Sequence, residues 1–184
     1  MKKFFAALIA ATMMLSLAAC GKSGIEDGWA DEDVEVTELE DGTKLYEAKL
    51  GSKLKTSWFD LTINNAYITE EALEGYTPAD GCALLVVEMT LKNTFEESVP
   101  MWDEDFWVDW GTDDEGTYPV RTSEDLTDDQ FPAEYNLAVK EEKTGTLVFE
   151  VPADETDLCI NFVEYFDNDT IGNWYAVYFT PDKK

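Results

Sequence analysis

The fold is decided by one stretch of alternating apolar and polar residues, Leu85-Val86-Val87-Glu88-Met89-Thr90-Leu91-Lys92-Asn93. In an extended strand, successive side chains point to opposite faces, so the apolar residues at 85, 87, 89 and 91 share one face. The polar residues Glu88, Thr90 and Lys92 share the other face. We therefore predict a β-strand that has one face buried in a core.

The same period of two recurs on either side of this strand. It is clear in Trp58-Phe59-Asp60-Leu61-Thr62-Ile63-Asn64, and further candidate strands lie at 106–110, 117–121, 145–151, 157–166 and 173–180. Clusters of Pro, Gly, Asp and Asn separate these runs, and no long helical period lies between them. The pattern predicts a single all-β domain over residues 52–184, an antiparallel β-sandwich of seven to eight strands.

The N-terminus has the pattern of an export signal. A basic start at Lys2 and Lys3 precedes an apolar run over 4–19, which is too short for an ordinary membrane-spanning helix. The run ends in Leu17-Ala18-Ala19-Cys20-Gly21, which resembles a bacterial lipobox. Residues 1–19 are thus a predicted lipoprotein signal peptide, and lipid on Cys20 would anchor the chain on the outer side of a bacterial membrane. The alternative is a simple cleaved signal peptide with an incidental cysteine.

Residues 20–51 are predicted to be an acidic, flexible tether that follows the lipidated cysteine. Gly and Ser are frequent at its start, and the run Asp31-Glu32-Asp33 opens a series of carboxylates. Because like charges repel and no hydrophobic period is present, the segment is expected to be extended and to hold the domain clear of the membrane. A short strand near Leu45 and Tyr46 stays an open alternative.

Charge and composition exclude several classes of function. The 184 residues include 40 acidic and 13 basic ones, for a net charge of −27, and no histidine. Nucleic-acid binding needs Lys and Arg to neutralise phosphates, and Arg121 is the sole arginine, so no nucleic-acid partner is expected. Without histidine there is no Ser-His-Asp catalysis and no His-ligated zinc. A hydrophobic fraction of 45% predicts a packed core rather than a disordered acidic chain.

Three motifs, taken in order, resemble a known family. They are the strand Gly81-Cys82-Ala83-Leu84-Leu85-Val86-Val87-Glu88-Met89-Thr90-Leu91-Lys92-Asn93-Thr94, the strand and turn Phe106-Trp107-Val108-Asp109-Trp110-Gly111, and the strand Gly145-Thr146-Leu147-Val148-Phe149-Glu150-Val151-Pro152. Together they are similar to a telokin-like, immunoglobulin-fold domain of unknown function found in lipoproteins of Gram-positive bacteria. The resemblance spans about residues 57–180 and implies an immunoglobulin-like sandwich outside the cell. It brings no catalytic residue with it.

Cys82 and Cys159 are the other two cysteines. An exported domain permits a disulfide between them. By strand alternation, however, both point away from the core between the sheets, where only adjacent strands would bring them together. Two free, half-buried cysteines are therefore favoured over a Cys82–Cys159 disulfide.

The densest aromatic feature is the group of three tryptophans between residues 102 and 110. If residues 106–110 form a strand with Phe106 and Val108 facing inward, then Asp105, Trp107 and Asp109 share the outer face. A tryptophan flanked by carboxylates suits a sugar ring or a cationic group. The candidate ligand-binding residues are accordingly Trp102, Asp105, Trp107 and Asp109.

An alternative interpretation of these aromatic residues stays open. Trp107 would then pack beneath the loop over 112–132 and leave the aspartates in water, which is the commoner situation for such residues. Trp174 and Tyr178 share one face of the last predicted strand, and the same two interpretations apply to them.

The acidic turns do not match a calcium motif. Asp167-Asn168-Asp169-Thr170-Ile171-Gly172 begins like an EF-hand loop, but its twelfth position is Tyr178 instead of glutamate. The clusters Asp103-Glu104-Asp105 and Asp113-Asp114-Glu115 are more simply explained as solvated turns. We predict no metal and no cofactor, and calcium binding to an acidic turn stays an open alternative.

The sequence thus favours a lipid-anchored surface protein whose domain is a non-catalytic binding or interaction module for an extracellular protein or glycan. The alternative is a structural or accessory component of an envelope or membrane complex that takes no small ligand. A carboxylate-based glycan hydrolase ranks last, because pairs of carboxylates are abundant here by composition alone and short turns offer little cleft.

Overall fold

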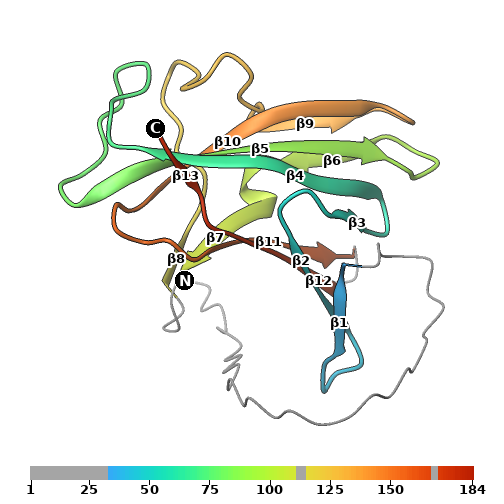
Figure 1. Ribbon diagram of the computed structural model, residues 1–184. Coiled ribbons are helices and arrows are strands. Elements are labelled where there is room, and N and C mark those ends of the chain that lie inside the picture. Colours follow the sequence, from blue (N-terminus) through green and yellow to red (C-terminus); the bar gives the residue numbers. More distant parts are fainter. Residues whose placement is uncertain (1–32, 111–114, 167–169) are drawn as a thin grey trace, which may run out of the picture.

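The computed structural model describes residues 33–110, 115–166 and 170–184, and within them the chain is built from β-strands with one 3₁₀ turn and no α-helix (Figure 1). The strands are β1 (Glu35–Glu38), β2 (Lys44–Lys49), β3 (Lys53–Lys55), β4 (Phe59–Thr69), β5 (Cys82–Asn93), β6 (Val99–Trp102), β7 (Phe106–Trp110), β8 (Glu115–Thr117), β9 (Glu134–Leu137), β10 (Glu142–Pro152), β11 (Leu158–Tyr165), β12 (Ile171–Phe179) and β13 (Asp182–Lys183). The 3₁₀ turn η1 (Asp103–Asp105) joins β6 to β7. The predicted all-β class is confirmed.

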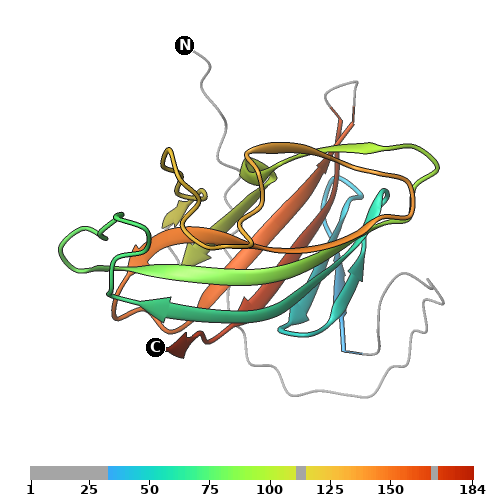
Figure 2. The same cartoon turned by 90° about the horizontal axis from the view of Figure 1, so that it is seen from above.

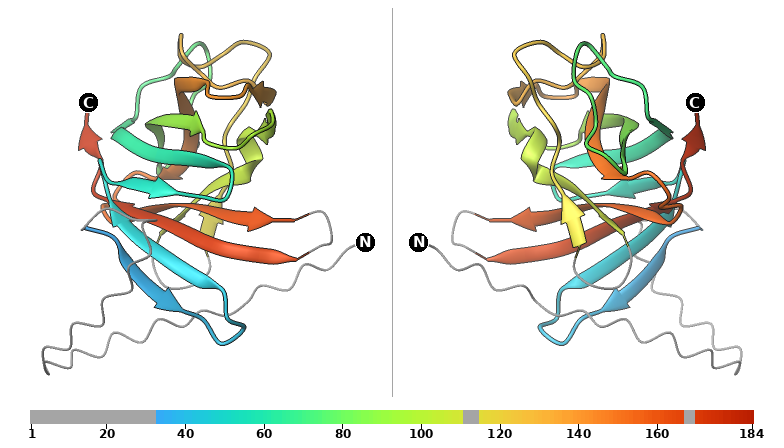
Figure 3. Two further views of the ribbon diagram at one scale, coloured as in Figure 1. Left: turned by 90° about the vertical axis from the view of Figure 1, so that its right-hand side faces the viewer. Right: turned by 90° about the vertical axis from the view of Figure 1, so that its left-hand side faces the viewer.

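Two main sheets pack face to face as a sandwich (Figures 2 and 3). The six-stranded sheet has the order β1-β2-β12-β11-β7-β8, and the five-stranded sheet has the order β10-β5-β4-β13 with β3 also paired to β4. Strands β6 and β9 form a separate pair. The sandwich differs from the prediction in two ways: it contains more than eight strands, and β2–β12 and β4–β13 are parallel pairs rather than antiparallel ones.

The core between the sheets follows the predicted alternation. Leu85, Val87, Met89 and Leu91 of β5 are all buried in it, whereas Glu88 on the other face is exposed. On the facing sheet, aromatic rings make up much of the core. The ring of Phe162 contacts those of Phe59, Phe106 and Tyr175 at centroid distances of 5.1, 5.5 and 5.9 Å.

Part of the predicted tether belongs to the folded domain. Strand β2 runs parallel to β12, and β1 pairs with β2 at the edge of the six-stranded sheet, where Figure 3 shows them extending that layer. Tyr46 and Ala48 of β2 are buried in the core, and the Tyr46 ring stacks on Tyr175 at 5.1 Å. The folded domain therefore begins before residue 52, the predicted boundary. Strand β2 was not predicted as part of the domain because charged residues surround its two apolar inward positions, Tyr46 and Ala48.

A second, smaller core lies on the outer side of the five-stranded sheet. Leu84 and Val86 of β5 and Val148 of β10 are buried there beneath Leu126, with Tyr67, Leu73, Tyr76 and Val120 packed around them. The segment between β8 and β9 carries Val120 and Leu126 over this core. Arg121 holds this segment in place, because its guanidinium donates to the Asp103 carboxylate and to the Phe131 carbonyl. The outer face of the five-stranded sheet is therefore partly covered. The candidate site lies on the outer face of the other, six-stranded sheet.

The signal peptide, Cys20 and the first part of the tether lie outside the described residues. In the part of the chain that the structure describes, no helix has the length and apolar character needed to cross a membrane.

Candidate functional site

The candidate site is the outer face of the six-stranded sheet, across β7, β11 and β12. Phe106 and Val108 of β7 are 2% and 0% exposed in the core, so the alternate residues Trp107 and Asp109 point outward, as predicted. Trp107 lies opposite Asn161 of β11 in the ladder, and Asp109 lies opposite Cys159. Trp174 and Tyr178 occupy the outward positions of β12.

The carboxylate of Asp109 is held by two neighbours. Its Oδ2 accepts a hydrogen bond from the Trp107 indole Nε1 at 3.1 Å and another from Asn161 Nδ2 at 2.9 Å. Both donors lie on the same face, so this network fixes the plane of the indole and the direction of the carboxylate. A ligand would therefore meet a surface that is already ordered.

Two tryptophans converge over β11 from its two neighbours. The rings of Trp107 and Trp174 lie edge to face, with centroids 6.2 Å apart and an interplanar angle of 86°. On this same outer face, Val163 and Ala176 are only 4% and 3% exposed, although neither belongs to the core between the sheets. Trp107 and Trp174 themselves are half-buried, so each presents part of its ring to solvent.

Three exposed tyrosines extend the aromatic character of this side of the sheet. Tyr178 is about half exposed, and its hydroxyl donates to Glu47 Oε1 on β2 at 3.1 Å. Tyr165 ends β11 and is 63% exposed, and Tyr118 follows β8 directly and is 59% exposed. We call the group Trp107, Trp174, Tyr118, Tyr165 and Tyr178 the aromatic face.

The other two predicted ligand-binding residues, Trp102 and Asp105, lie apart from this network. Trp102 ends β6 and is 44% exposed, while Asp105 lies in the 3₁₀ turn rather than in β7. The Asp105 carboxylate accepts a hydrogen bond from the Trp102 backbone N–H at 2.8 Å, and burial, with Asp103 and Glu104 nearby, raises its pKa to about 6. Alternation extended back from Trp107 therefore gives the wrong position for Asp105, which lies one residue before β7 begins. The predicted set splits into an outer-face pair and a turn pair.

The two cysteines are free, so the alternative of a disulfide is not realised. Cys82 starts β5 in one sheet, whereas Cys159 lies on β11 in the other sheet. Cys159 is buried on the outer side of its sheet, with its thiol 3.4 Å from Asn161 Oδ1. Burial, together with Asp109 and Glu47, raises the pKa of the Cys159 thiol, which leaves it a poor nucleophile.

Among the described residues, no group of three Asp, Glu, Cys or His side chains is arranged to hold a metal ion. Asp103 is paired with Arg121, and Asp105 caps the turn, so this acidic cluster is committed to the fold. Asp113 and Asp114, and the loop 167–169, lie outside the described residues.

Sequence reasoning missed Asn161, which supports the Asp109 carboxylate. An isolated asparagine in an apolar run carries no functional signal, and its role appears only when β11 and β7 are paired. The contact between Trp174 and Trp107 could not be predicted from the sequence either, because the two residues are 67 positions apart and β11 lies between their strands.

Comparison with known proteins identifies the type of domain. A family model described as a domain of unknown function matches residues 48–171, which is more than half of the chain. No curated protein matches the chain.

Three solved structures share the fold at low sequence identity. YjhA of Bacillus subtilis is 19% identical, with 73% of this chain and 98% of that one covered and a TM-score of 0.53. MPT63, a secreted protein of Mycobacterium tuberculosis, is 15% identical, with 73% and 96% covered and a TM-score of 0.51. YcdA of Bacillus subtilis, which is proposed to be a lipoprotein, is 16% identical with a TM-score of 0.52. There 71% of this chain is covered but only 38% of that one. At these identities the similarity shows the fold alone.

Proposed function

Since this chain belongs to the DUF4352 family, a domain of unknown function, we propose its function from its own surface: a non-catalytic binding module that a lipid anchor holds outside the cell. Within the β-sandwich class, we assign this domain to the immunoglobulin-like type. The carrying observation is the ordered aromatic face, in which Trp107 meets Trp174 at 6.2 Å beside a fixed Asp109 carboxylate.

The ligand class that this face suits best is a neutral glycan. Sugar rings stack their C–H faces on aromatic side chains, and their hydroxyls donate to carboxylates and amide oxygens. Asp109 and Asn161 supply such acceptors beside Trp107. A net charge of −27 disfavours polyanionic ligands, because they would be repelled at long range.

The experiment is a titration of the folded chain with the tetramer of N-acetylglucosamine, followed by calorimetry. Trp174→Ala removes one ring of the pair and is expected to weaken binding by about two- to tenfold, since a specific contact with an aromatic ring contributes about 0.5–1.5 kcal/mol. Trp102→Ala is the matched control, because it removes an exposed tryptophan outside the aromatic face. Absence of binding, or equal affinity of wild type and Trp174→Ala, would contradict the proposed site.

Anchoring is tested separately at Cys20. We expect Cys20→Ser to abolish labelling with a fatty acid and to release the protein from cells. Continued labelling of the Cys20→Ser chain would contradict the anchor without bearing on the aromatic face.

A second candidate function is a structural or accessory role in a membrane complex. The exposed rings of Tyr118, Tyr165 and Tyr178 favour it, because exposed tyrosines are enriched at protein interfaces. Crosslinking of the intact protein on cells would then capture one reproducible protein partner, and Tyr165→Ala would reduce that capture. The wild-type protein would show no binding in the glycan titration.

A further inference from the structure

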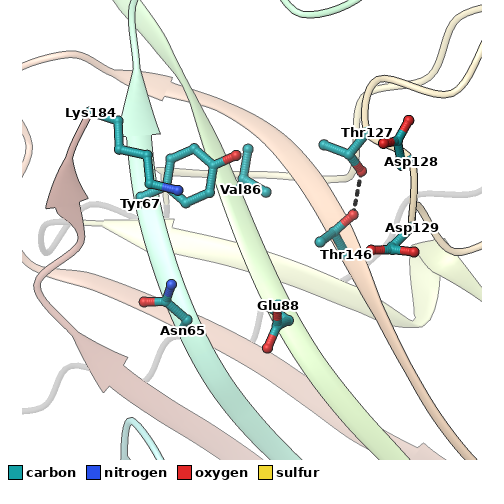
Figure 4. Close-up of a pocket in the computed structure, with 9 residues that line it drawn as sticks. All are labelled: Asn65, Tyr67, Val86, Glu88, Thr127, Asp128, Asp129, Thr146 and Lys184. Atoms are coloured by element: carbon teal, nitrogen blue, oxygen red, sulfur yellow. Dashed lines mark hydrogen bonds between the residues drawn. The ribbon is translucent and has the colours of Figure 1, made fainter.

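A groove lies on the opposite side of the sandwich, on the outer face of the five-stranded sheet. It has a volume of about 290 Å³ and is lined by residues from five separate segments, namely β4, β5, residues 127–129, β10 and the residue after β13. In Figure 4, Tyr67 and Lys184 form one side, Val86 and Glu88 of β5 lie in the middle, and Asp128 and Asp129 form the other side. The groove is thus distinct from the aromatic face and shares no residue with it.

An ammonium group already occupies the aromatic part of this groove. Lys184 Nζ lies 3.5 Å from the centroid of the Tyr67 ring, the distance of a close cation–π contact (Figure 4). The ring is held from behind, because Tyr67 packs against the small core that contains Leu84, Val86 and Val148. The backbone N–H of Lys184 donates to the Ile68 carbonyl at 3.0 Å, which keeps the lysine beside the ring.

Three carboxylates face the same groove. Glu88, Asp128 and Asp129 line it, and among the described residues none of their side chains has a hydrogen-bonding or ion-pair partner. The groove thus contains one ammonium group, that of Lys184, and three carboxylates. The contrast with Asp103, which is paired with Arg121, indicates that these carboxylates are not used to hold the fold.

We propose that this groove binds an organic ligand that carries ammonium groups: one ammonium displaces Lys184 from the Tyr67 ring, and a second is held across the groove by the carboxylates of Glu88, Asp128 and Asp129. Lys184 acts as the internal occupant and shows that an ammonium fits the ring. A lysine side chain of a peptide and a free polyamine share this chemistry. The charge of the whole protein helps such a ligand, because it attracts cations from a distance.

The test uses two charge-matched variants. Lys184→Gln vacates the Tyr67 ring, whereas Lys183→Gln removes the same charge from the neighbouring exposed residue, which does not line the groove. Trilysine and spermidine are titrated into each protein at low salt, and amide chemical shifts are followed by NMR. Lys184→Gln is expected to bind about two- to fivefold more tightly than wild type, the range that an exposed cation–π contact corresponds to, while Lys183→Gln stays close to wild type.

Further variants separate a built site from general attraction between charges. Tyr67→Leu keeps every charge and should abolish the saturable shifts at the groove, and Asp128→Asn with Asp129→Asn should weaken them. Shifts spread over the acidic surface, equal effects of Lys183→Gln and Lys184→Gln, or unchanged binding by Tyr67→Leu would each overturn the proposal. Trilysine binding without spermidine binding identifies a peptide as the source, and the reverse identifies a polyamine. Trp174→Ala tests the aromatic face and is expected to leave this binding intact.

Discussion

The buried carboxylate of Glu164 on β11 accepts a hydrogen bond from the hydroxyl of Tyr175 on β12 at 2.9 Å. The same oxygen, Oε1, accepts from the backbone N–H of Ser57, while Oε2 accepts from the backbone N–H of Asn173. Ser57 lies just before β4 of the five-stranded sheet, and Tyr175 belongs to the six-stranded one. Glu164 therefore links the two sheets at one end of the core. Burial and the Glu164 carboxylate both raise the pKa of Tyr175, so its hydroxyl stays a donor at all ordinary pH values.

Glu164→Gln is expected to destabilise the fold. The amide group presents one oxygen and one donor to a site where three groups donate, so a buried N–H or O–H loses its acceptor. We expect a loss of about 1–3 kcal/mol in the free energy of unfolding, measured by urea titration. Glu96→Gln, at an exposed position, is the matched control and should change the midpoint little. Equal midpoints for the two variants would show that the link is dispensable.

The pairing of Arg121 with Asp103 fixes the segment that covers the small core. Asp103 is 5% exposed, so Arg121→Met leaves a buried negative charge without this partner and should cost about 2–3 kcal/mol in unfolding experiments. Arg121→Met combined with Asp103→Leu should lose less than the sum of the two single variants, because it removes both charges. Additive losses would mean that the two side chains do not interact.

Asp105 makes stability depend on pH in a defined direction. Its pKa of about 6 in the folded chain exceeds the ordinary value of 3.8, so the folded state holds this proton more tightly than the unfolded state. The contribution of Asp105 to stability is therefore full below pH 4 and is lost as the pH rises through 6. Allowing for its exposed part, the loss amounts to about 1–2 kcal/mol. Asp105→Asn should gain stability relative to wild type between pH 4 and 7, and parallel pH profiles of the two proteins would contradict this.

Local alternation was enough to predict the faces of β5 and β7. The inward positions of both strands are buried, and the outward direction of Trp107 and Asp109 follows from the same rule. Alternation failed where the backbone leaves regular strand geometry. Asp105 lies in a 3₁₀ turn, and a register shift between Ile63 and Asn65 in β4 turns Tyr67 outward.

Features built from distant segments could not be predicted in this way. The parallel pairing of β2 with β12 depends on contacts between residues about 130 positions apart, such as Trp174 opposite Leu45. The groove beside Tyr67 is lined by residues from five segments, and its acidic residues look like any other solvated carboxylates in a chain this acidic. Burial of Tyr46 was missed for a similar reason, since the charges around β2 outweighed its short apolar pattern.

The backbone of β8 offers a way to disturb the aromatic face without removing an aromatic ring. Gly116 lies opposite Asp109 in the β7–β8 ladder, and a Cβ at this position would overlap Asp109 Oδ1. Gly116→Ala must therefore turn the Asp109 carboxylate away from Trp107 Nε1 and Asn161 Nδ2. We expect about tenfold weaker binding of the N-acetylglucosamine tetramer, corresponding to the loss of one charge-assisted hydrogen bond. Thr117→Ala in the same strand is the control, and equal binding by both variants would show that the position of the carboxylate does not matter to the ligand.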